Sequence, residues 1–267
     1  MKKLFKAFKT VILALAYVAI YYAVTYLVQY AYMMWQNMSG MGSGSEIALN
    51  ARNNSYALGV ISMIVTFWVY ALIVHKRGIS LESISGKKVN PPIIYAMATC
   101  MAVGMRLLVS VYYSYSQSIE TLKKSIDDAA AYSPELNTGV QVAVALFSIA
   151  VVTPLFEEFL FRGLIMRELM TCVRPWLAIL LQAALFGLAH GVLFQSLFTF
   201  VVGIFLGVMY YKTQNIKTVA LCHGVFNMSV ILAQEGLTMK TGIIVAAMGV
   251  VLVVFSMSYI LIYCKRK

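Results

Sequence analysis

Two adjacent glutamates lie in the middle of an otherwise apolar segment, which reads V-T-P-L-F-E-E-F-L-F-R-G from Val152 to Gly163. Glu158 and Arg162 are four residues apart, so on a helix they share one face and can form an ion pair. Glu157 points roughly 100° away, because a helical turn takes 3.6 residues, and it has no partner in its own helix. A charge in an apolar span is costly, so both glutamates are candidates for a functional role.

A histidine follows in the next charge-free run, within F-G-L-A-H-G. It is His190, and Phe186 lies one turn earlier on the same helical face. If the chain turns at Arg174-Pro175, Glu157 and His190 lie at comparable depths, roughly 22–27 Å from that turn at 1.5 Å per residue. The sequence therefore predicts that these two side chains can meet.

A second histidine, His223, lies in H-G-V-F-N and shares a helical face with Asn227. His223 and Asn227 lie closer to the turn that precedes their helix than Glu157 lies to the turn at Arg174-Pro175. They reach the depth of Glu157 only if the helices are tilted or end unequally. A carboxylate beside an imidazole in a low-dielectric cavity can hold and deprotonate a water molecule. A His–Asn face can donate to the oxyanion of a tetrahedral intermediate, which is worth about 3–4 kcal/mol per donor.

The same side chains could also ligate a metal ion. Two histidines, a glutamate and a water form a known catalytic zinc arrangement. The chain lacks the HExxH helix of soluble zinc proteases, so the residues alone leave both mechanisms open.

The composition places these residues in a membrane protein. The 267-residue chain is 61% hydrophobic, far above the roughly 45–50% of soluble domains, and it contains repeated long charge-free runs. The net charge of +11 arises from basic residues at the ends of those runs, which is a topology signal and not a nucleic-acid-binding pattern. The four cysteines have no CxxC spacing, which favours packing over a disulfide or zinc framework.

We expect an all-α transmembrane bundle of about eight spans. The N-terminus resembles the start of a signal peptide, but the apolar run after it is too long, so it is interpreted as a retained first span. Residues 36–55 are expected to form a polar loop, and 114–137 a short amphipathic helix at the membrane surface. Arg106 is an intramembrane cation that needs a partner, and a structural role is favoured for it. The expected spans are residues 11–34, 56–75, 93–113, 139–172 with a kink at Pro154, two within 175–211 that turn near 191–195, 218–233 and 241–263.

The distribution of charge predicts that both termini are cytoplasmic. Basic clusters then face the cytoplasm at both termini and at residues 76–88, 167–174 and 212–217, whereas only Arg52, Lys123, Lys124 and Lys240 face outward. The expected organisation is three N-terminal spans with their loops in 1–138, a core in 139–234, and a last span with a basic tail in 235–267.

Three motifs in order resemble a known family. E-E-F-L-F-R, F-G-L-A-H and H-G-V-F-N are similar to the EExxxR, FxxxH and HxxxN motifs of the CAAX-protease and bacteriocin-processing (CPBP/Abi) family. These proteins are intramembrane endopeptidases of the type II CAAX prenyl endopeptidase kind. The resemblance covers about residues 142–233 and implies an all-helical, roughly eight-span fold whose active-site cavity opens to the cytoplasmic side.

The resemblance also implies roles for individual residues. Glu157 and His190 would activate the water, and His223 and Asn227 would stabilise the oxyanion. Three further residues would support them, namely Glu158, Arg162 and Phe186. We favour a mechanism without a metal or another cofactor, with zinc as the alternative.

The leading hypothesis is therefore a peptidase embedded in the cytoplasmic membrane of a bacterium. Its substrate would be a membrane-inserted or lipidated peptide, such as a bacteriocin, a signalling peptide or a CAAX-type tail, and its other contacts would be membrane lipids. One alternative is a catalytically idle membrane protein that confers immunity or scaffolds a partner. A second alternative is a transporter in which the glutamate pair and Arg106 couple transport to ions.

Overall fold

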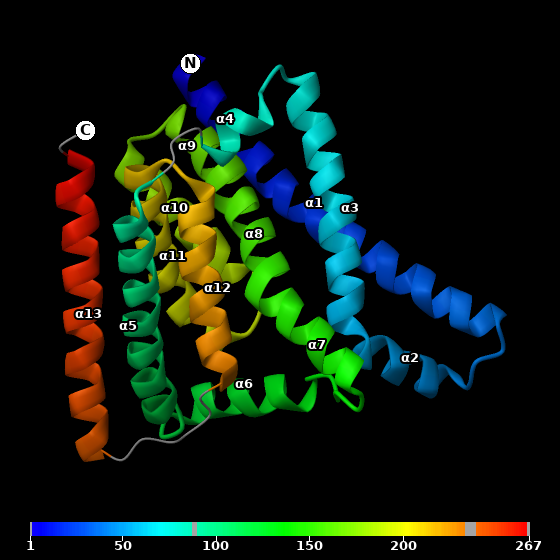
Figure 1. Cartoon of the computed structure of the whole chain (residues 1–267). Coiled ribbons are helices and arrows are strands. Elements are labelled where there is room, and N and C mark those ends of the chain that lie inside the picture. Colours follow the sequence, from blue (N-terminus) through cyan, green and yellow to red (C-terminus); the bar gives the residue numbers. More distant parts are fainter. Residues whose placement is uncertain (1, 87–89, 233–238, 266–267) are drawn as a thin grey trace.

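The computed structural model describes residues 2–86, 90–232 and 239–265, and every regular element within them is a helix (Figure 1). Six of these helices are long and apolar enough to cross a membrane by length and composition, and two more are apolar but shorter. The expected all-helical, multi-pass bundle is confirmed, whereas the count of eight spans and the side of the termini stay predictions. The long helices cover Phe5–Met38, Ser55–Lys76, Pro92–Ser116, Gly139–Met170, Leu193–Thr213 and Thr241–Cys264, and the short ones Pro175–Leu188 and Ile216–Ile231.

Several expectations fall on parts of the chain outside the described residues. They are the end of the seventh span at 233, the domain boundary at 234–235, and the basic residues 87, 88, 266 and 267.

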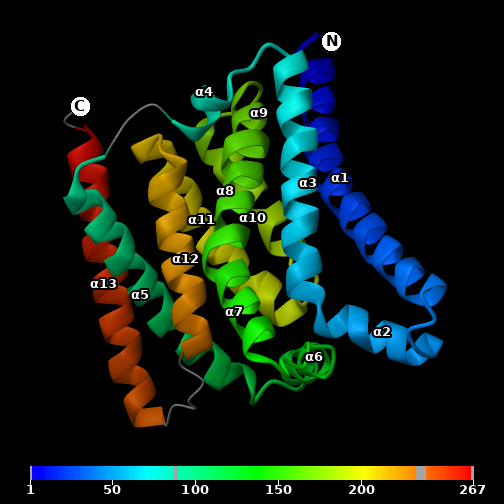
Figure 2. The same cartoon turned by 45° about the vertical axis from the view of Figure 1, so that its right-hand side comes forward.

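Helices α1 (Lys2–Met38) and α3 (Ser55–Lys76) form one side of the molecule (Figure 2). The segment between them, which we expected to be a loop, contains helix α2 (Gly44–Asn53). The backbone N–H of Ser43 donates to Glu46 at 2.6 Å, and the Ser43 hydroxyl donates to the same carboxylate at 2.9 Å. The Glu46 side chain thereby stabilises the first turn of α2. The expectation of a loop was wrong, because this local capping outweighs the Gly- and Ser-rich composition.

On the opposite side, α5 (Pro92–Ser116) packs along α13 (Met239–Lys265). The predicted amphipathic helix is present as α6 (Glu120–Ala131), which lies across one end of the bundle (Figure 1). Arg106 on α5 donates from Nε to the carbonyl of Ser229 at 3.0 Å and from Nη1 to the Ser110 hydroxyl. The contact with Ser229 joins α5 to α12, and the contact with Ser110 lies within α5.

The glutamate pair lies on one continuous helix that runs from Gly139 to Met170. Its α-helical parts α7, α8 and α9 are separated by two π-helical segments, η1 and η2, which flank α8. The predicted long helix is confirmed, but its wider π turns were not predicted. The bounds are α7 Gly139–Phe147, η1 Ser148–Val152, α8 Thr153–Glu158, η2 Phe159–Met166 and α9 Arg167–Met170.

The remaining helices surround this long helix. Helix α10 (Pro175–Leu188) is followed by a short turn and by α11 (Leu193–Thr213), close to the turn that we expected at 191–195. Helix α12 (Ile216–Leu232) packs against α5, η1 and α8, and the short helix α4 (Leu81–Ser85) covers η2. Most buried apolar side chains belong to one core cluster.

Candidate active site

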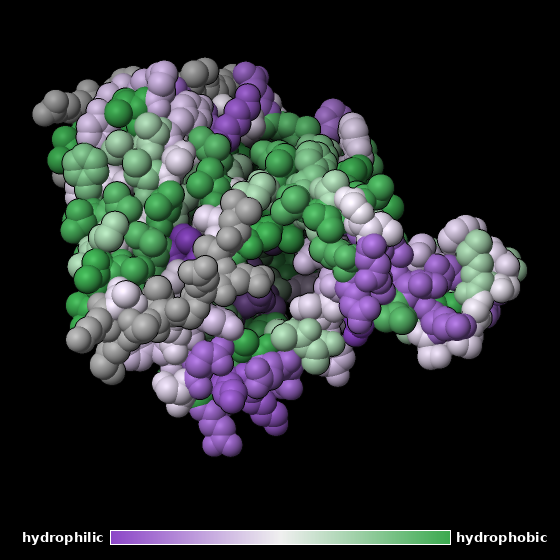
Figure 3. All heavy atoms as spheres, turned by 60° about the horizontal axis from the view of Figure 1, so that its bottom comes forward, coloured by the Kyte–Doolittle hydropathy of each residue, from purple (hydrophilic) through white to green (hydrophobic). Residues whose placement is uncertain are grey.

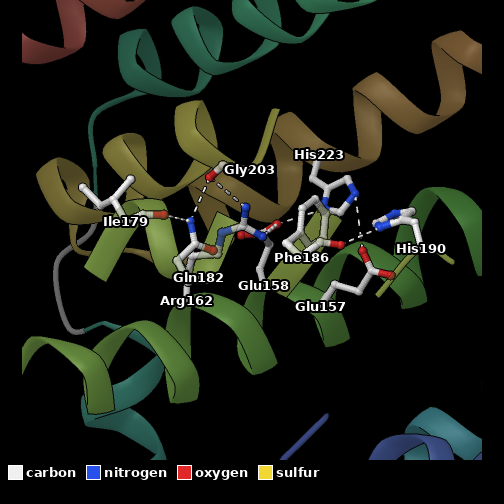
Figure 4. A network of polar contacts seen from close by, with 9 residues as sticks. All are labelled: Glu157, Glu158, Arg162, Ile179, Gln182, Phe186, His190, Gly203 and His223. Atoms are coloured by element: carbon white, nitrogen blue, oxygen red, sulfur yellow. Dashed lines mark hydrogen bonds and ion pairs between the residues drawn. The ribbon is translucent and has the colours of Figure 1, made fainter. Parts of the chain in front are cut away.

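A buried network of ionisable side chains connects the long helix of residues 139–170 with α12 (Figure 4). Arg162 donates from Nη1 to Oε1 of Glu158 at 2.8 Å, as the sequence predicted, and both side chains are fully buried. His223 of α12 lies 2.8 Å from the same oxygen through its Nδ1 atom. Because a carboxylate can only accept, this nitrogen is the donor. Glu158 is thereby held between a guanidinium and an imidazole.

Arg162 makes a second contact, which the sequence did not reveal. Its Nη2 atom donates to the carbonyl of Gly203 at 3.2 Å, and the side chain of Gln182 donates to the same carbonyl at 2.9 Å. A Cβ atom at Gly207 would lie 2.6 Å from the Gln182 amide nitrogen, so this amide packs directly against the Gly207 backbone. The signal for Gln182 was its position one turn before Phe186 in a charge-free run.

Glu157 and His190 line one pocket of about 130 Å³. The Glu157 carboxylate is turned toward the imidazole rings of His190 and His223 (Figure 4), and its Oε2 atom lies 3.7 Å from Nε2 of His223. That distance exceeds a hydrogen bond, but it is within the range of an ion pair when the imidazole is protonated. Glu157 and His190, which the sequence predicted could meet, therefore line one pocket. His223 lies beside Glu157, although the sequence left its depth open.

His190 itself lies in the turn after α10 and not within the span, where the sequence placed it. Its Nδ1 atom is 2.8 Å from the carbonyl of Phe186. Because a carbonyl only accepts, Nδ1 carries the proton, and in the neutral ring Nε2 keeps its lone pair. This nitrogen can therefore accept a proton or a hydrogen bond.

Phe186 packs against the guanidinium of Arg162 and against both histidine rings. Its ring lies edge-on to His190, with 4.9 Å between the centroids, and edge-on to His223 at 5.8 Å. The Arg162 guanidinium carbon lies 4.6 Å from its centroid, within the range of a cation–π contact. Phe186 thus contacts both imidazole rings and the charged end of Arg162.

Asn227 contacts the long helix at a different point from His223. Its Nδ2 atom donates to the carbonyl of Ile149 in η1 at 3.1 Å. In an α-helix that carbonyl would accept the N–H of Thr153, but the π turn directs this N–H to Ser148 instead. The Asn227 amide therefore satisfies a carbonyl that the π segment exposes.

Two tyrosines of α1 complete the pocket, and sequence reasoning missed both. Tyr21 and Tyr22 line it together with Val18, and the Tyr22 hydroxyl donates to the carbonyl of Ala189 at 2.5 Å. The only signal was a pair of adjacent polar hydroxyls in an apolar span, which is weak. The first helix thereby contacts the turn that carries His190.

Within the described residues, no three or more His, Cys, Asp or Glu side chains are grouped in a way that could hold a metal ion. The four cysteines are free thiols, and Cys222 is fully buried.

Fold and site together define a polytopic helical membrane protein with a buried Glu/His cluster. Residues 139–229 match the family model for type II CAAX prenyl endopeptidase Rce1-like proteins. The chain therefore carries an Rce1-like domain of the CPBP/Abi family over these residues. Comparisons with curated proteins and with solved structures gave no match.

Proposed function

We propose that this protein is an intramembrane endopeptidase that hydrolyses a peptide bond of a membrane-inserted or lipidated peptide. The observation that carries the proposal is the pocket shared by Glu157 and His190, a carboxylate and an imidazole inside an apolar bundle. The family match over residues 139–229 supports peptide hydrolysis as the reaction class.

In the proposed reaction, Glu157 takes a proton from a water molecule that is also bonded to Nε2 of His190. The water oxygen forms a bond to the carbonyl carbon of the substrate, and the carbonyl oxygen gains negative charge. Glu157 then returns its proton to the leaving nitrogen as the C–N bond breaks. General base catalysis of this kind contributes about 10²- to 10⁴-fold to the rate.

The proposed donors to the oxyanion are His223 and Asn227. For this role Nε2 of His223 must carry a proton, so the ring acts as an imidazolium whose charge is stabilised by Glu158, 2.8 Å from its other nitrogen. Asn227 uses one amide hydrogen for Ile149, and the second would be the donor to substrate. Each donor is worth about 3–4 kcal/mol in the transition state.

Glu158 and Arg162 are assigned a supporting role. Removing one partner of a fully buried ion pair leaves an uncompensated charge and costs about 3–5 kcal/mol. The ion pair fixes the Glu158 carboxylate, which in turn holds His223 through the contact at 2.8 Å. Phe186 keeps both imidazole rings oriented.

We assign this catalytic core to residues 139–234 and extend the bundle to eight spans by including α10 and α12, with both termini in the cytoplasm. Helix α10 has 14 residues, which is about 21 Å at 1.5 Å per residue. This is less than the roughly 30 Å of a hydrocarbon core. Helix α10 alone would therefore cross only part of the membrane, and longer neighbouring helices would surround its ends.

The proposal is tested by comparing the peptides in membranes that contain the wild-type protein with those that contain Glu157→Gln or His190→Ala. Both variants should lose 10²-fold or more of the cleavage, whereas Glu120→Gln on the exposed face of α6 should retain it. Normal cleavage by both variants would refute the assignment. Activity should also persist after chelation, and stoichiometric zinc in the active protein would replace this mechanism with a metal-dependent one.

A further inference from the structure

The two ends of the bundle differ in charge. Both termini, α4 and α9 lie at one end, which we call the basic end (Figures 1 and 2). Helices α2 and α6 lie at the other, which we call the α6 end. Described basic side chains at the basic end are Lys6, Lys9, Lys76, Arg77, Arg167, Arg174, Lys212 and Lys217, and those at the α6 end are Arg52, Lys123 and Lys124.

Toward the basic end, the candidate site is closed by tight packing. Every residue of η2, which follows Glu158 in that direction, is buried. A Cβ atom at Gly163 would lie 2.6 Å from Ile84 of α4 and 3.1 Å from Ile216 of α12. The Tyr210 hydroxyl of α11 donates to the Ile84 carbonyl at 3.2 Å. Four helical elements meet here, and water or a peptide could not pass without separating them.

Toward the α6 end, the turn that carries His190 lies between two pockets. Ala189 and His190 line the pocket of Glu157, and Gly191 and Val192 line a second pocket of about 570 Å³ against α6. This second pocket is partly polar, with Thr121, Lys124, Asp128 and Gln195 in its wall. The surface at this end is hollowed, with hydrophilic atoms set back inside it (Figure 3).

A hydrogen bond joins α6 to the first turn of α11. The Ser125 hydroxyl of α6 accepts the backbone N–H of Phe194 at 3.2 Å. Because Phe194 lies in the first turn of α11, directly after the turn of His190, this bond holds α6 beside that turn. The polar groups that could bring water to Glu157 are thus gathered at the α6 end.

Building on the endopeptidase proposed above, we propose that the site receives its substrate from the α6 end, and that the hydrolysed bond lies on the non-cytoplasmic side of the membrane. Loops with an excess of Lys and Arg stay in the cytoplasm, which assigns the basic end to that side. With this assignment the opening lies opposite the cytoplasmic termini, whereas the family resemblance implied an opening on the cytoplasmic side. The substrate class is a membrane-inserted peptide whose scissile segment is exposed on the outer side.

The orientation is tested by thiol labelling of whole cells. Cys100, Cys172 and Cys264 are replaced by serine, while the fully buried Cys222 is left in place. Thr121→Cys then reports the entrance at α6, and Ser80→Cys is the matched control, exposed beside α4 without a capping hydrogen bond from its side chain. A membrane-impermeant maleimide should label the first variant in intact cells and the second only after permeabilisation. The reverse pattern would overturn the proposal.

The entrance is tested by measuring cleavage in the same cells. A bulky maleimide on Thr121→Cys should lower cleavage at least tenfold, whereas labelled Ser80→Cys in inside-out membranes should keep it. If Glu157→Gln abolishes cleavage but the label at residue 121 does not lower it, the entrance is wrong and the endopeptidase assignment stands. If Glu157→Gln cleaves normally, the endopeptidase assignment fails, and the labelling still reports the orientation.

Discussion

At the scale of single residues, His190 is held by contacts from two helices. Its Nδ1 atom donates to the Phe186 carbonyl of α10, and the carbonyl of Ala189, the residue before it, accepts the hydroxyl of Tyr22 from α1. The first contact sets the tautomer and the second sets the position of the turn. The first contact lies within the F-G-L-A-H motif. The second comes from α1, which lies outside residues 139–229.

We therefore expect Tyr22→Phe to weaken catalysis without abolishing it. The ring would still fill the pocket wall, but one hydrogen bond, worth a net of about 0.5–1.5 kcal/mol, would be lost from the turn of His190. The rate should fall roughly two- to tenfold, since about 1.4 kcal/mol is tenfold. The control is Tyr26→Phe, one turn further along α1 and largely exposed. Equal rates for both variants would show that the Tyr22 contact does not position His190.

At the scale of elements, the two π segments determine how the glutamate helix meets α12. Pro154 has no N–H to give to the carbonyl of Ala150, four residues earlier. That carbonyl faces α12 at Gly224, where an added Cβ atom would lie 2.4 Å from its oxygen. Since Gly224 directly follows His223, this close approach brings the imidazole to Glu158.

Gly224→Ala should consequently separate α12 from η1. Overpacking a close contact costs about 1–3 kcal/mol, so the purified variant should denature at a lower temperature, and cleavage should fall as His223 moves away from Glu158. Gly59→Ala on α3 has nothing within 4 Å of the added methyl group and should be neutral or slightly stabilising. A Gly224→Ala protein as stable and active as wild type would contradict the assigned role of this contact.

At the scale of the whole molecule, two helices outside residues 139–229 pack one behind the other against the matched domain. Helix α13 packs on α5 through Gly104 and Gly249, and α5 packs on α12, which carries His223. An added Cβ atom at Gly104 would lie 2.9 Å from both Leu252 and Val253. In a lipid environment such small residues allow helices to approach closely and gain dispersion energy.

Gly104→Ala is therefore expected to destabilise the bundle by about 1–3 kcal/mol. The measurement is the fraction of folded protein after heating in detergent, compared with Gly242→Ala, whose methyl group would meet nothing within 4 Å. Because Gly104 does not line the pocket of Glu157 and His190, the activity per folded molecule should change little. A large loss of activity with unchanged stability would contradict this assignment.

Much of the candidate site could be predicted from the sequence, because its strongest signals are local. The pairing of Glu158 with Arg162 follows from their spacing on one helix, and the alignment of Phe186 with His190 follows in the same way. The link from His223 to Glu158 could not be derived, since it depends on the relative depth and tilt of two helices. The contact of Asn227 with Ile149 could not be derived either, because it requires a π turn.

The helical membrane bundle and the pairing of Glu158 with Arg162 follow from the sequence alone, because hydrophobic runs and spacings of four residues act over a few turns of one helix. Only the tertiary structure decided that Tyr22 reaches the turn of His190, and that this turn lies between the site pocket and the α6 pocket. These features depend on where helices that are distant in the sequence approach each other. Contacts of that kind are fixed by the packing of whole helices and leave almost no pattern in any one segment.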